Sequence, residues 1–221
     1  MAIQNSAECA ELARLAPRPL GGRTKRAFDL VGASLAILFL APLLLIIAGL
    51  IYRHDGGPVI IKHKRLGRNG EKFDCLKFRT MVANADEVLR QHLAENPEAA
   101  HEWELNRKLC RDPRVTKLGL VLRKTSLDEL PQLINVVRGD MSLVGPRPVV
   151  RAELPKYGDD VGYYLMVRPG MTGLWQVSGR SDLDYDSRVY LDTWYVKNWS
   201  LWHDQIILFK TIHVVFHRAG A

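Results

Sequence analysis

The sequence predicts an α+β fold in which an N-terminal membrane helix precedes a small mixed domain of short strands and amphipathic helices. Three observations predict this fold: one long apolar run, short strand-like segments separated by glycine-containing turns, and later segments with apolar residues at helical spacing. The chain has 221 residues, of which 47% are hydrophobic and 25% charged, as in one domain with an appendage. We expect a mobile tail over residues 1–24, a membrane helix over 25–54 and a globular domain over 55–221.

The apolar run covers residues 30–52 and contains no charged side chain. Its length of about 23 residues is enough for a helix to cross a membrane. The residues before it include Pro17, Pro19, Gly21 and Gly22, a composition typical of a tail without regular structure. Basic residues flank the run on both sides: Arg23, Lys25, Arg26, Arg53, Lys62, Lys64, Arg65 and Arg68.

These flanks favour a re-entrant helix, which enters and leaves the membrane on the same face. The positive-inside tendency places both basic flanks in the cytoplasm, and a straight span cannot satisfy it. Pro42 lies near the centre of the run, lacks the N–H for a helical hydrogen bond and clashes with the carbonyl of Leu38. We therefore expect a bend there. The alternative is an ordinary kinked span with the later domain on the basic side.

The rest of the chain is predicted to alternate short strands with helices. Strands are expected at residues 58–62 and 72–78, around a turn at 67–70. A helix interrupted at Asn96-Pro97 is expected over 83–110, and apolar residues from 127 to 137 mark another. Further strands are expected at 141–144 and at 163–173, the latter leading into turns. Residues 199–216 contain Asp204 and Lys210, so we expect an amphipathic helix at the membrane interface or over the core.

The charge and the cysteines restrict the class of function. A net charge of +7 implies an anionic partner such as a phosphate-bearing substrate, anionic lipid or nucleic acid. The three cysteines are far apart and in no metal-binding spacing, so neither a disulfide framework nor a zinc site is indicated. A reducing, cytoplasm-facing domain follows. The sequence contains neither a P-loop nor a kinase catalytic-loop motif.

Two adjacent carboxylates, Asp128 and Glu129, are the strongest local signal for chemistry. Ser126 has capping-box spacing to Glu129 and Pro131 suits a first helical turn, so a helix is predicted to begin near Asp128. The positive end of that helix would keep both carboxylates ionised. An ionised carboxylate can attack phosphorus or hold Mg²⁺ against a diphosphate if a cation such as Arg123 is near. The alternative is that both acids only cap the helix.

Arginines in rigid Gly/Pro turns are a second feature of the sequence. A guanidinium matches two phosphate oxygens, and a rigid turn limits the entropy lost on binding. These turns occur at residues 77–81 (KFRTM), 145–148 (GPRP), 168–176 (RPGMTGLWQ) and 178–180 (SGR). Together they indicate a site for a phosphate-bearing substrate.

In combination these segments resemble the bacterial sugar transferase family of monotopic phosphoglycosyl transferases. The resemblance rests on KRAFD before the apolar run, KFRTM, SLDELPQL, SLVGPRP and RPGMTGLWQVSGR, which occur in this order between residues 25 and 216. It is closest to the exopolysaccharide-initiating branch, which transfers galactose or glucose phosphate to undecaprenyl phosphate. The family implies a re-entrant helix, an active site on the cytoplasmic face of the inner membrane, and UMP release from a UDP-sugar through a covalent intermediate.

The resemblance also implies roles for individual residues. Asp128 corresponds to the nucleophile and Glu129 to a ligand of the Mg²⁺ cofactor. Arg123, Arg147 and Arg180 are expected to contact phosphates or nucleotide. The full set of expected substrate-binding residues is Arg123, Pro146, Arg147, Pro148, Arg180, Lys77, Arg79, Thr172 and Gly173. We assign no individual role to Lys77, Arg79 or Asp204, which also match family positions. The expected partners are a UDP-sugar, undecaprenyl phosphate and inner-membrane lipids.

Two other functions compete with this interpretation. A membrane-bound phosphatase, or another phosphoryl-transfer enzyme, could use the same aspartate and release free phosphate. A basic membrane-tethered protein could bind nucleic acid or anionic lipid. We expect no nucleic-acid partner, because the arginines stand singly in Gly/Pro turns rather than in a basic stripe with interleaved aromatic residues.

Overall fold

The computed structural model describes residues 20–179 and 183–219. Most of the expected tail lies outside these ranges. Its last residues, however, belong to the folded protein, because Leu20 packs against the main core and the first helix begins at Gly22. The expectation of a tail up to residue 24 is therefore wrong at its C-terminal end. The mixed α+β class with a long apolar N-terminal helix is confirmed.

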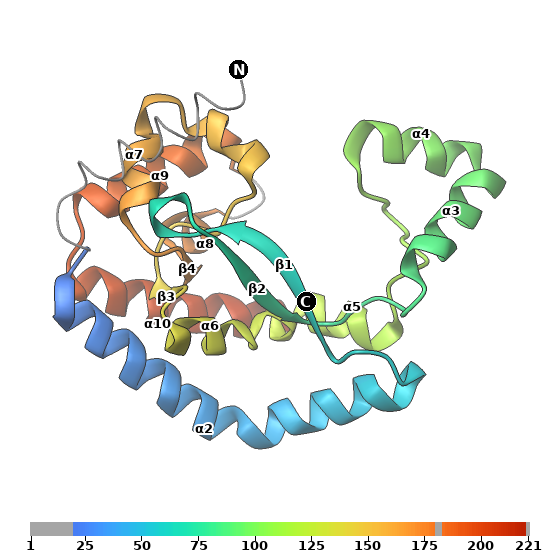
Figure 1. The fold of residues 1–221 in the computed structure, drawn as a ribbon, viewed down its shortest axis with the longest axis horizontal. Coiled ribbons are helices and arrows are strands. Elements are labelled where there is room, and N and C mark those ends of the chain that lie inside the picture. The colour runs from blue at the N-terminus through green and yellow to red at the C-terminus, as the bar shows by residue number, and fades with distance from the viewer. Residues whose placement is uncertain (1–19, 180–182, 220–221) are drawn as a thin grey trace.

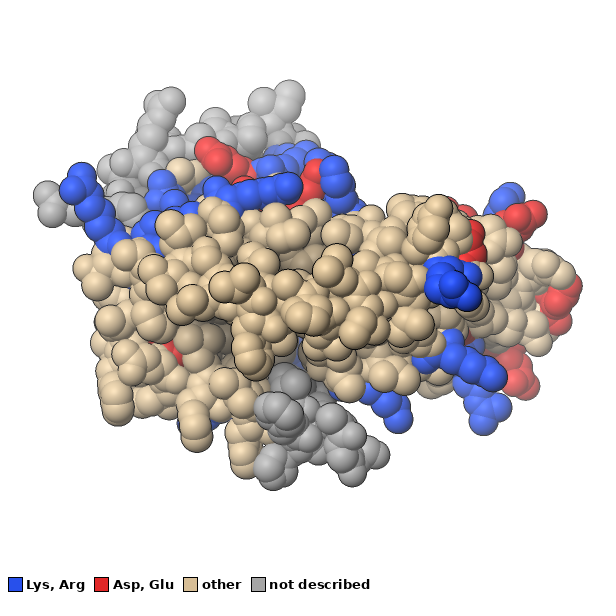
Figure 2. Space-filling model, turned by 90° about the horizontal axis from the view of Figure 1, so that it is seen from below, with Lys and Arg blue, Asp and Glu red and all other residues tan. Residues whose placement is uncertain are grey.

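Helix α2, Gly22–Asp55, is long and apolar enough to cross a membrane, and no other helix in the described ranges is. It runs without interruption through Pro42 and bends near its middle (Figure 1). Its outer face is strongly exposed, with 84% of Phe39 accessible. Figure 2 shows this underside as a broad uncharged surface with Lys and Arg at its margins. A helix that exposes such a face is suited to insertion into lipid.

The inner side of α2 packs on the domain. Ala33 belongs to the main core together with Val136, Met141 and Tyr195, while Ile47 and Ile51 pack with Phe78 and Leu122 in a second cluster. The helix thus has one face in contact with the protein and the other uncovered. Such a division suits a helix that has one face on the protein and the other in lipid.

A β-hairpin follows α2, formed by β1, Ile60–Leu66, and β2, Lys72–Phe78. The prediction for the second strand is confirmed, whereas the first strand lies later than the expected 58–62. The turn contains Asn69 and Gly70 at φ 59° and 73°, conformations that Asn and Gly tolerate best. Antiparallel pairing places Ile61 opposite Lys77 and His63 opposite Cys75, so these side chains share one face of the hairpin.

Helices α3, Ala85–Glu95, and α4, Pro97–Asn106, come next and project from the body (Figure 1). The predicted break at Asn96-Pro97 is confirmed. After α5, Lys117–Lys124, the expected helix near Asp128 is divided: a 3-10 turn η2, Leu127–Glu129, precedes α6, Gln132–Arg138. Ser126 has φ 57°, which is incompatible with a continuous helix. Its side chain forms no capping box.

The last third of the chain completes the domain around a two-stranded parallel pair. Strand β3, Ser142–Val144, confirms the prediction for 141–144 and pairs with β4, Gly170–Thr172. The expected strand at 163–173 is wrong in its first half, because α7, Val161–Met166, is helical there. The remaining elements are η3, Arg151–Asp160; α8, Leu174–Ser178; α9, Tyr185–Lys197; and α10, Leu201–Ala219. Helix α10 confirms the predicted amphipathic helix.

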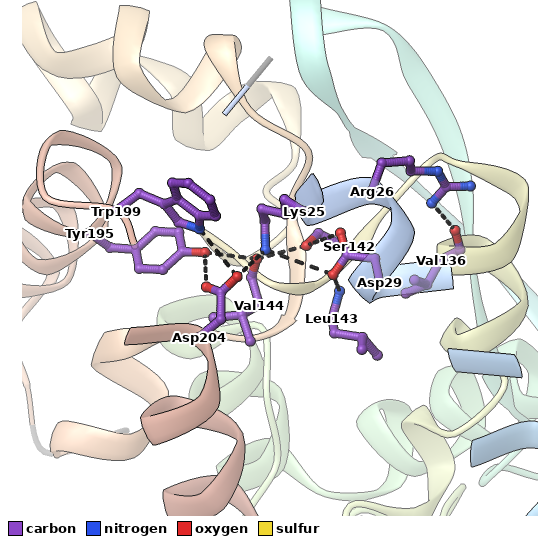
Figure 3. A network of polar contacts seen from close by, with 10 residues as sticks. All are labelled: Lys25, Arg26, Asp29, Val136, Ser142, Leu143, Val144, Tyr195, Trp199 and Asp204. Atoms are coloured by element: carbon purple, nitrogen blue, oxygen red, sulfur yellow. Dashed lines mark hydrogen bonds and ion pairs between the residues drawn. The ribbon is translucent and has the colours of Figure 1, made fainter. Parts of the chain in front are cut away.

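A buried ion pair joins the start of α2 to α10 (Figure 3). Lys25 Nζ lies 2.7 Å from Oδ2 of Asp204 and 3.7 Å from Oδ1 of Asp29, and Asp204 is completely buried. The hydroxyl of Tyr195 donates to Oδ1 of Asp204 at 2.6 Å. Asp29 accepts from Oγ of Ser142 at 2.8 Å, which adds β3 to the same network. One lysine therefore holds three parts of the chain together.

We predict that Lys25→Met lowers the free energy of unfolding in detergent by about 3 kcal/mol, because it leaves two buried carboxylates without their cation. Denaturant titration of the purified protein measures the effect. The control is Lys64→Met, since Lys64 Nζ lies 2.6 Å from Asp74 but its side chain is 74% exposed. Such a surface pair contributes about 1 kcal/mol or less. Equal losses for the two variants would contradict a special role of the buried pair.

Candidate active site

A cleft of about 740 Å³ lies between the hairpin, the η2 turn and the last helices. Strand alternation directs Ile61, His63 and Arg65 of β1 into it, together with Lys77 of β2. The opposite wall contains Arg147, Thr172 and residues of α8 and α9. Elements far apart in the sequence thus contribute to one cavity.

Asp128 and Glu129 lie in this cleft, as predicted. The positive φ of Ser126 turns the chain just before them. Lys77 Nζ lies 2.6 Å from Oε1 of Glu129 and 4.0 Å from Oδ2 of Asp128. Asp128 is only 9% exposed. One lysine therefore faces both carboxylates from the neighbouring strand.

Asn135 holds this arrangement in place. Its side chain is fully buried, accepts from the backbone N–H of Leu76 at 3.0 Å and donates to the carbonyl of Asp74 at 2.8 Å. These bonds attach α6 to β2. They also satisfy a backbone N–H and a carbonyl group of β2 that would otherwise lack a hydrogen-bond partner. The η2 turn, which directly precedes α6, is thereby fixed beside Lys77.

The environment of Asp128 differs from the one expected at a helix N-terminus. Burial raises the pKa of Asp128, Lys77 and Arg123 oppose that shift, and Glu129 adds to it. Asp128 lies in a 3-10 turn before α6 rather than at the helix N-terminus that was expected, and burial has the largest effect on its pKa. Lys77 provides the compensating charge. The result is a desolvated carboxylate beside a fixed cation.

Further cations surround the carboxylates. Arg123 donates from Nε to Oγ1 of Thr80 at 2.8 Å, which fixes its position in the lining of the cleft. Sequence reasoning missed four other cationic or polar side chains in the lining: Arg65, Lys108, Arg188 and His63. Strand alternation from Ile61 could have identified Arg65 and His63. Nothing in the sequence indicated Lys108, in the loop after α4, or Arg188, on α9.

Arg147 lies at the edge of the cleft with an exposed side chain on a tightly held turn. The backbone N–H of Gly145 donates to the carbonyl of Thr172 at 2.9 Å, and that of Gly170 donates to the carbonyl of Pro146 at 2.7 Å. A Cβ on Gly170 would lie 2.1 Å from the backbone nitrogen of Gly145. The two backbones are thus in direct contact, which only glycine permits.

The other predicted residues of this region shape the cleft more than they line it. Pro146 is buried and Pro148 half-buried, so both fix the turn around Arg147. Thr172 lines the cleft, and its Oγ1 lies 2.7 Å from Oγ1 of Thr211 on α10. Gly173 lies behind the lining, where a Cβ would meet the carbonyl oxygen of Gly145 at 2.5 Å. Thr211 is a further lining residue that no sequence motif indicated.

Arg79 does not lie in the cleft. It is buried against the end of α2, where its guanidinium pairs with Asp55. Strand β2 ends at Phe78, so the alternation that brings Lys77 into the cleft does not extend to Arg79. Asp204 is also outside the cleft, in the network with Lys25. Arg180 lies outside the described residues.

The carboxylate pair suits a hard divalent cation. Mg²⁺ is usually bound by one or two carboxylates, with substrate phosphates and water as its other ligands. Glu129 and Asp128 offer two such oxygen donors, and no group of three or more His, Cys, Asp or Glu side chains that could hold a metal occurs in the described ranges, the cleft included. Glu129 is the more accessible of the two. The donor set therefore fits Mg²⁺ shared with a phosphate-bearing substrate.

Known proteins resemble this chain over almost its whole length. Residues 21–218 match the family described as bacterial sugar transferase. The UDP-galactose-lipid carrier transferase of Erwinia amylovora is 61% identical over 197 residues, which are 89% of this chain and 41% of that protein. The undecaprenyl-phosphate galactose phosphotransferase of Salmonella typhimurium is 59% identical with the same coverage.

A relative of similar size is the exopolysaccharide production protein ExoY of Rhizobium meliloti. It is 56% identical over 206 residues, which are 93% of this chain and 91% of that protein. The chain therefore spans less than half the length of the first two relatives and almost all of the third. The resemblance that the sequence motifs indicated is confirmed, and the chain belongs to the bacterial sugar transferase family.

Proposed function

We propose that this protein transfers a hexose 1-phosphate, galactose or glucose, from a UDP-sugar to undecaprenyl phosphate and releases UMP. This would be the first membrane step of exopolysaccharide synthesis. The observation that carries the proposal is the buried Asp128 beside Glu129 and Lys77 in a cation-lined cleft. The names of the Erwinia and Salmonella relatives support galactose transfer to a lipid carrier.

The charges of the cleft suit a diphosphate. Arg65, Lys77, Arg123, Arg147 and Arg188 all line the cavity, while Asp128 and Glu129 are its acidic groups. Guanidinium groups bind phosphate oxygens through paired hydrogen bonds, and Arg147 is fixed on a turn that limits the entropy lost on binding. A nucleotide diphosphate sugar would bring its negative charge to these cations and its sugar-bearing phosphorus to Asp128.

We propose that Asp128 then forms a covalent intermediate. Its carboxylate oxygen attacks the sugar-bearing phosphorus, the bond from that phosphorus to the bridging oxygen breaks, and UMP leaves with the bonding electrons. An oxygen of undecaprenyl phosphate next attacks the same phosphorus and releases the Asp128 carboxylate. Two steps allow each anionic partner to use the cationic cleft in turn.

Lys77 and Glu129 have separate tasks in this scheme. Lys77 stabilises the ionised form of Asp128 against the effect of burial and approaches the charge that develops on the phosphorus oxygens. Glu129 would hold Mg²⁺, which supplies neutralisation of the diphosphate charge when bound. Because Lys77 contacts Glu129 at 2.6 Å, it also fixes the orientation of that ligand.

We further propose that α2 is re-entrant and that the cleft faces the cytoplasm. Helix α2 bends with its convex side away from the domain (Figure 1), and residues on both sides of the bend pack against the domain. The exposed outer face is uncharged, with basic residues at its margins (Figure 2). Basic residues at both ends favour the cytoplasmic side for each. This arrangement would bring a polyprenyl phosphate headgroup to the level of the cleft.

Asp128→Asn should abolish turnover, because it keeps the size of the side chain and removes the nucleophile. Protein quenched with UDP-galactose in the absence of acceptor should carry a sugar phosphate on the peptide that contains Asp128, detected by mass spectrometry, and the Asn variant should not. Steady-state kinetics should be ping-pong. An unmodified peptide together with intersecting kinetic patterns would instead favour direct transfer, with Asp128 as a base or metal ligand.

Removal of Mg²⁺ by a chelator should abolish UMP formation from UDP-galactose and polyprenyl phosphate. Glu129→Gln should raise the Mg²⁺ concentration for half-maximal activity at least tenfold, or about 1.4 kcal/mol, because a neutral amide is a weaker ligand for a hard cation. The matched control is Glu104→Gln in α4, outside the cleft. An unchanged Mg²⁺ requirement in Glu129→Gln would remove Glu129 from the metal site.

The two ends of α2 should label from the same side of the membrane. We expect single cysteines at Arg23 and at Arg53, in a cysteine-free background, to react with an impermeant maleimide only after the inner membrane is opened. The reason is that both positions belong to basic flanks and α2 bends between them. Reaction of the cysteine at position 23 in intact spheroplasts would exclude the re-entrant arrangement and favour a straight span.

A further inference from the structure

Another buried carboxylate, Asp192 of α9, lies behind the turn that presents Arg147. It is 3% exposed and borders a small cavity that shares Arg147, Trp175 and Arg188 with the main cleft. That cavity has a volume of about 20 Å³, enough for one water molecule and too small for a substrate group. Asp192 therefore acts on the cleft through its neighbours rather than by touching a substrate.

Among the described residues, Asp192 has one firm hydrogen bond and no ion-pair partner. Its Oδ2 accepts from the hydroxyl of Tyr157 at 2.9 Å, whereas its Oδ1 is buried without a hydrogen bond of ordinary geometry to any described residue. The positive groups that act on the carboxylate are the backbone N–H and the guanidinium of Arg147. The charge of Asp192 is thus directed at a single residue.

The chain on the far side of Arg147 is also held by buried groups. The hydroxyl of Tyr164 accepts from the backbone N–H of Val149 at 3.1 Å and donates to the carbonyl of Leu66 at 2.8 Å. With the bonds of Gly145 and Pro146 to the β4 segment, the turn is fixed at both ends. Asp192 acts on the middle of the turn, at Arg147.

We infer that Asp192 is a positioning residue for nucleotide-sugar binding, whose negative charge orients Arg147 at the edge of the cleft. The inference rests on the proposed function, because it assumes that Arg147 contacts the diphosphate. An oriented guanidinium loses less entropy on binding than one that must be ordered by the substrate. Loss of the Asp192 charge should therefore weaken donor binding without removing any contact to the donor.

The effect of Asp192 on stability separates this role from a structural one. Burial raises the pKa of Asp192 to about 7, against the opposing effects of Tyr157 and Arg147. A carboxyl group with a raised pKa in the folded state binds its proton more tightly there than in the unfolded chain. Stability is therefore lost as the pH rises from about 4 through 7. The ionised carboxylate of Asp192 lowers the free energy of unfolding. We therefore assign its role to donor binding in the cleft and not to stability.

The neighbouring titratable groups leave Asp192 as the group that changes charge near pH 7. Burial raises the pKa of Tyr157, Tyr164 and Tyr185, which remain neutral there, and the basic side chains that border the same cavity are Arg147 and Arg188. Glu153 accepts the backbone N–H of Val150 at 2.9 Å at the start of η3. Donor affinity should accordingly increase as the pH rises through 7 and Asp192 becomes ionised.

Binding of UDP-galactose to the full chain carrying Asp128→Asn tests this, since that variant binds the donor without reacting. We expect the Kd to fall about five- to tenfold between pH 6 and pH 8. Addition of Asp192→Asn should raise the Kd at pH 8 about tenfold, remove the pH dependence and leave the Tm at pH 8 equal or higher. Tyr157→Phe, which removes the hydrogen bond to Oδ2, should shift the midpoint of the pH dependence upward.

Asp204→Asn is the matched control, because Asp204 is equally buried but is paired with Lys25. It should lower the Tm and leave the Kd of the folded protein unchanged. A pH dependence that persists in Asp192→Asn, or a lowered Tm with an unchanged Kd, would overturn the inference. If Asp192→Asn does not fold, the Tyr157→Phe variant provides the test: an unshifted midpoint of the pH dependence of Kd would overturn the inference. Failure of the wild-type protein to convert UDP-galactose would instead refute the proposed function.

Discussion

The structure depends on the ion pair between Lys25 and Asp204, because it attaches an apolar helix to a polar domain. Dispersion contacts along α2 are nearly as favourable with lipid as with protein, so they cannot by themselves keep the helix against the domain. A lysine buried with two aspartates has no equivalent partner in hydrocarbon. The attachment is therefore specific in position, and it lies where β3, α9 and α10 meet.

The position of the cleft follows from that attachment. Strand β3 leads from the network directly into the turn of Arg147, and α6 connects the inner face of α2 to the turn of Asp128. The carboxylates and the arginine thus reach one cavity from two sides of the same anchor. Asp204 and Asp192 divide two tasks between them, since the first has a cation and holds the fold while the second faces Arg147 and lacks an ion pair.

Local sequence patterns predicted the elements that local forces determine. The apolar run, the second strand, the break at Asn96-Pro97 and the amphipathic C-terminal helix were recognisable because periodicity and proline act over a few residues. The motif around Asp128 and Glu129 indicated the chemistry of the site. The helix expected there is present from Gln132 to Arg138, but Asp128 lies in a separate 3-10 turn before it, after Ser126 at φ 57°. Arg79 was misassigned because its partner Asp55 is distant in sequence, and Arg188 and Thr211 were missed for the same reason.

The glycines between β3 and β4 have a consequence for how this enzyme family can diversify. Gly145, Gly170 and Gly173 leave no room for a side chain, so the wall beside Arg147 consists of main chain packed on main chain. Mutation cannot gradually remodel such a wall, because any larger residue would separate the two segments. Under the proposed function, changes in sugar preference are expected among lining side chains outside this contact, such as Ile61, His63 and Arg65 on β1. Divergence between relatives should accordingly be low at these glycines and higher among those side chains.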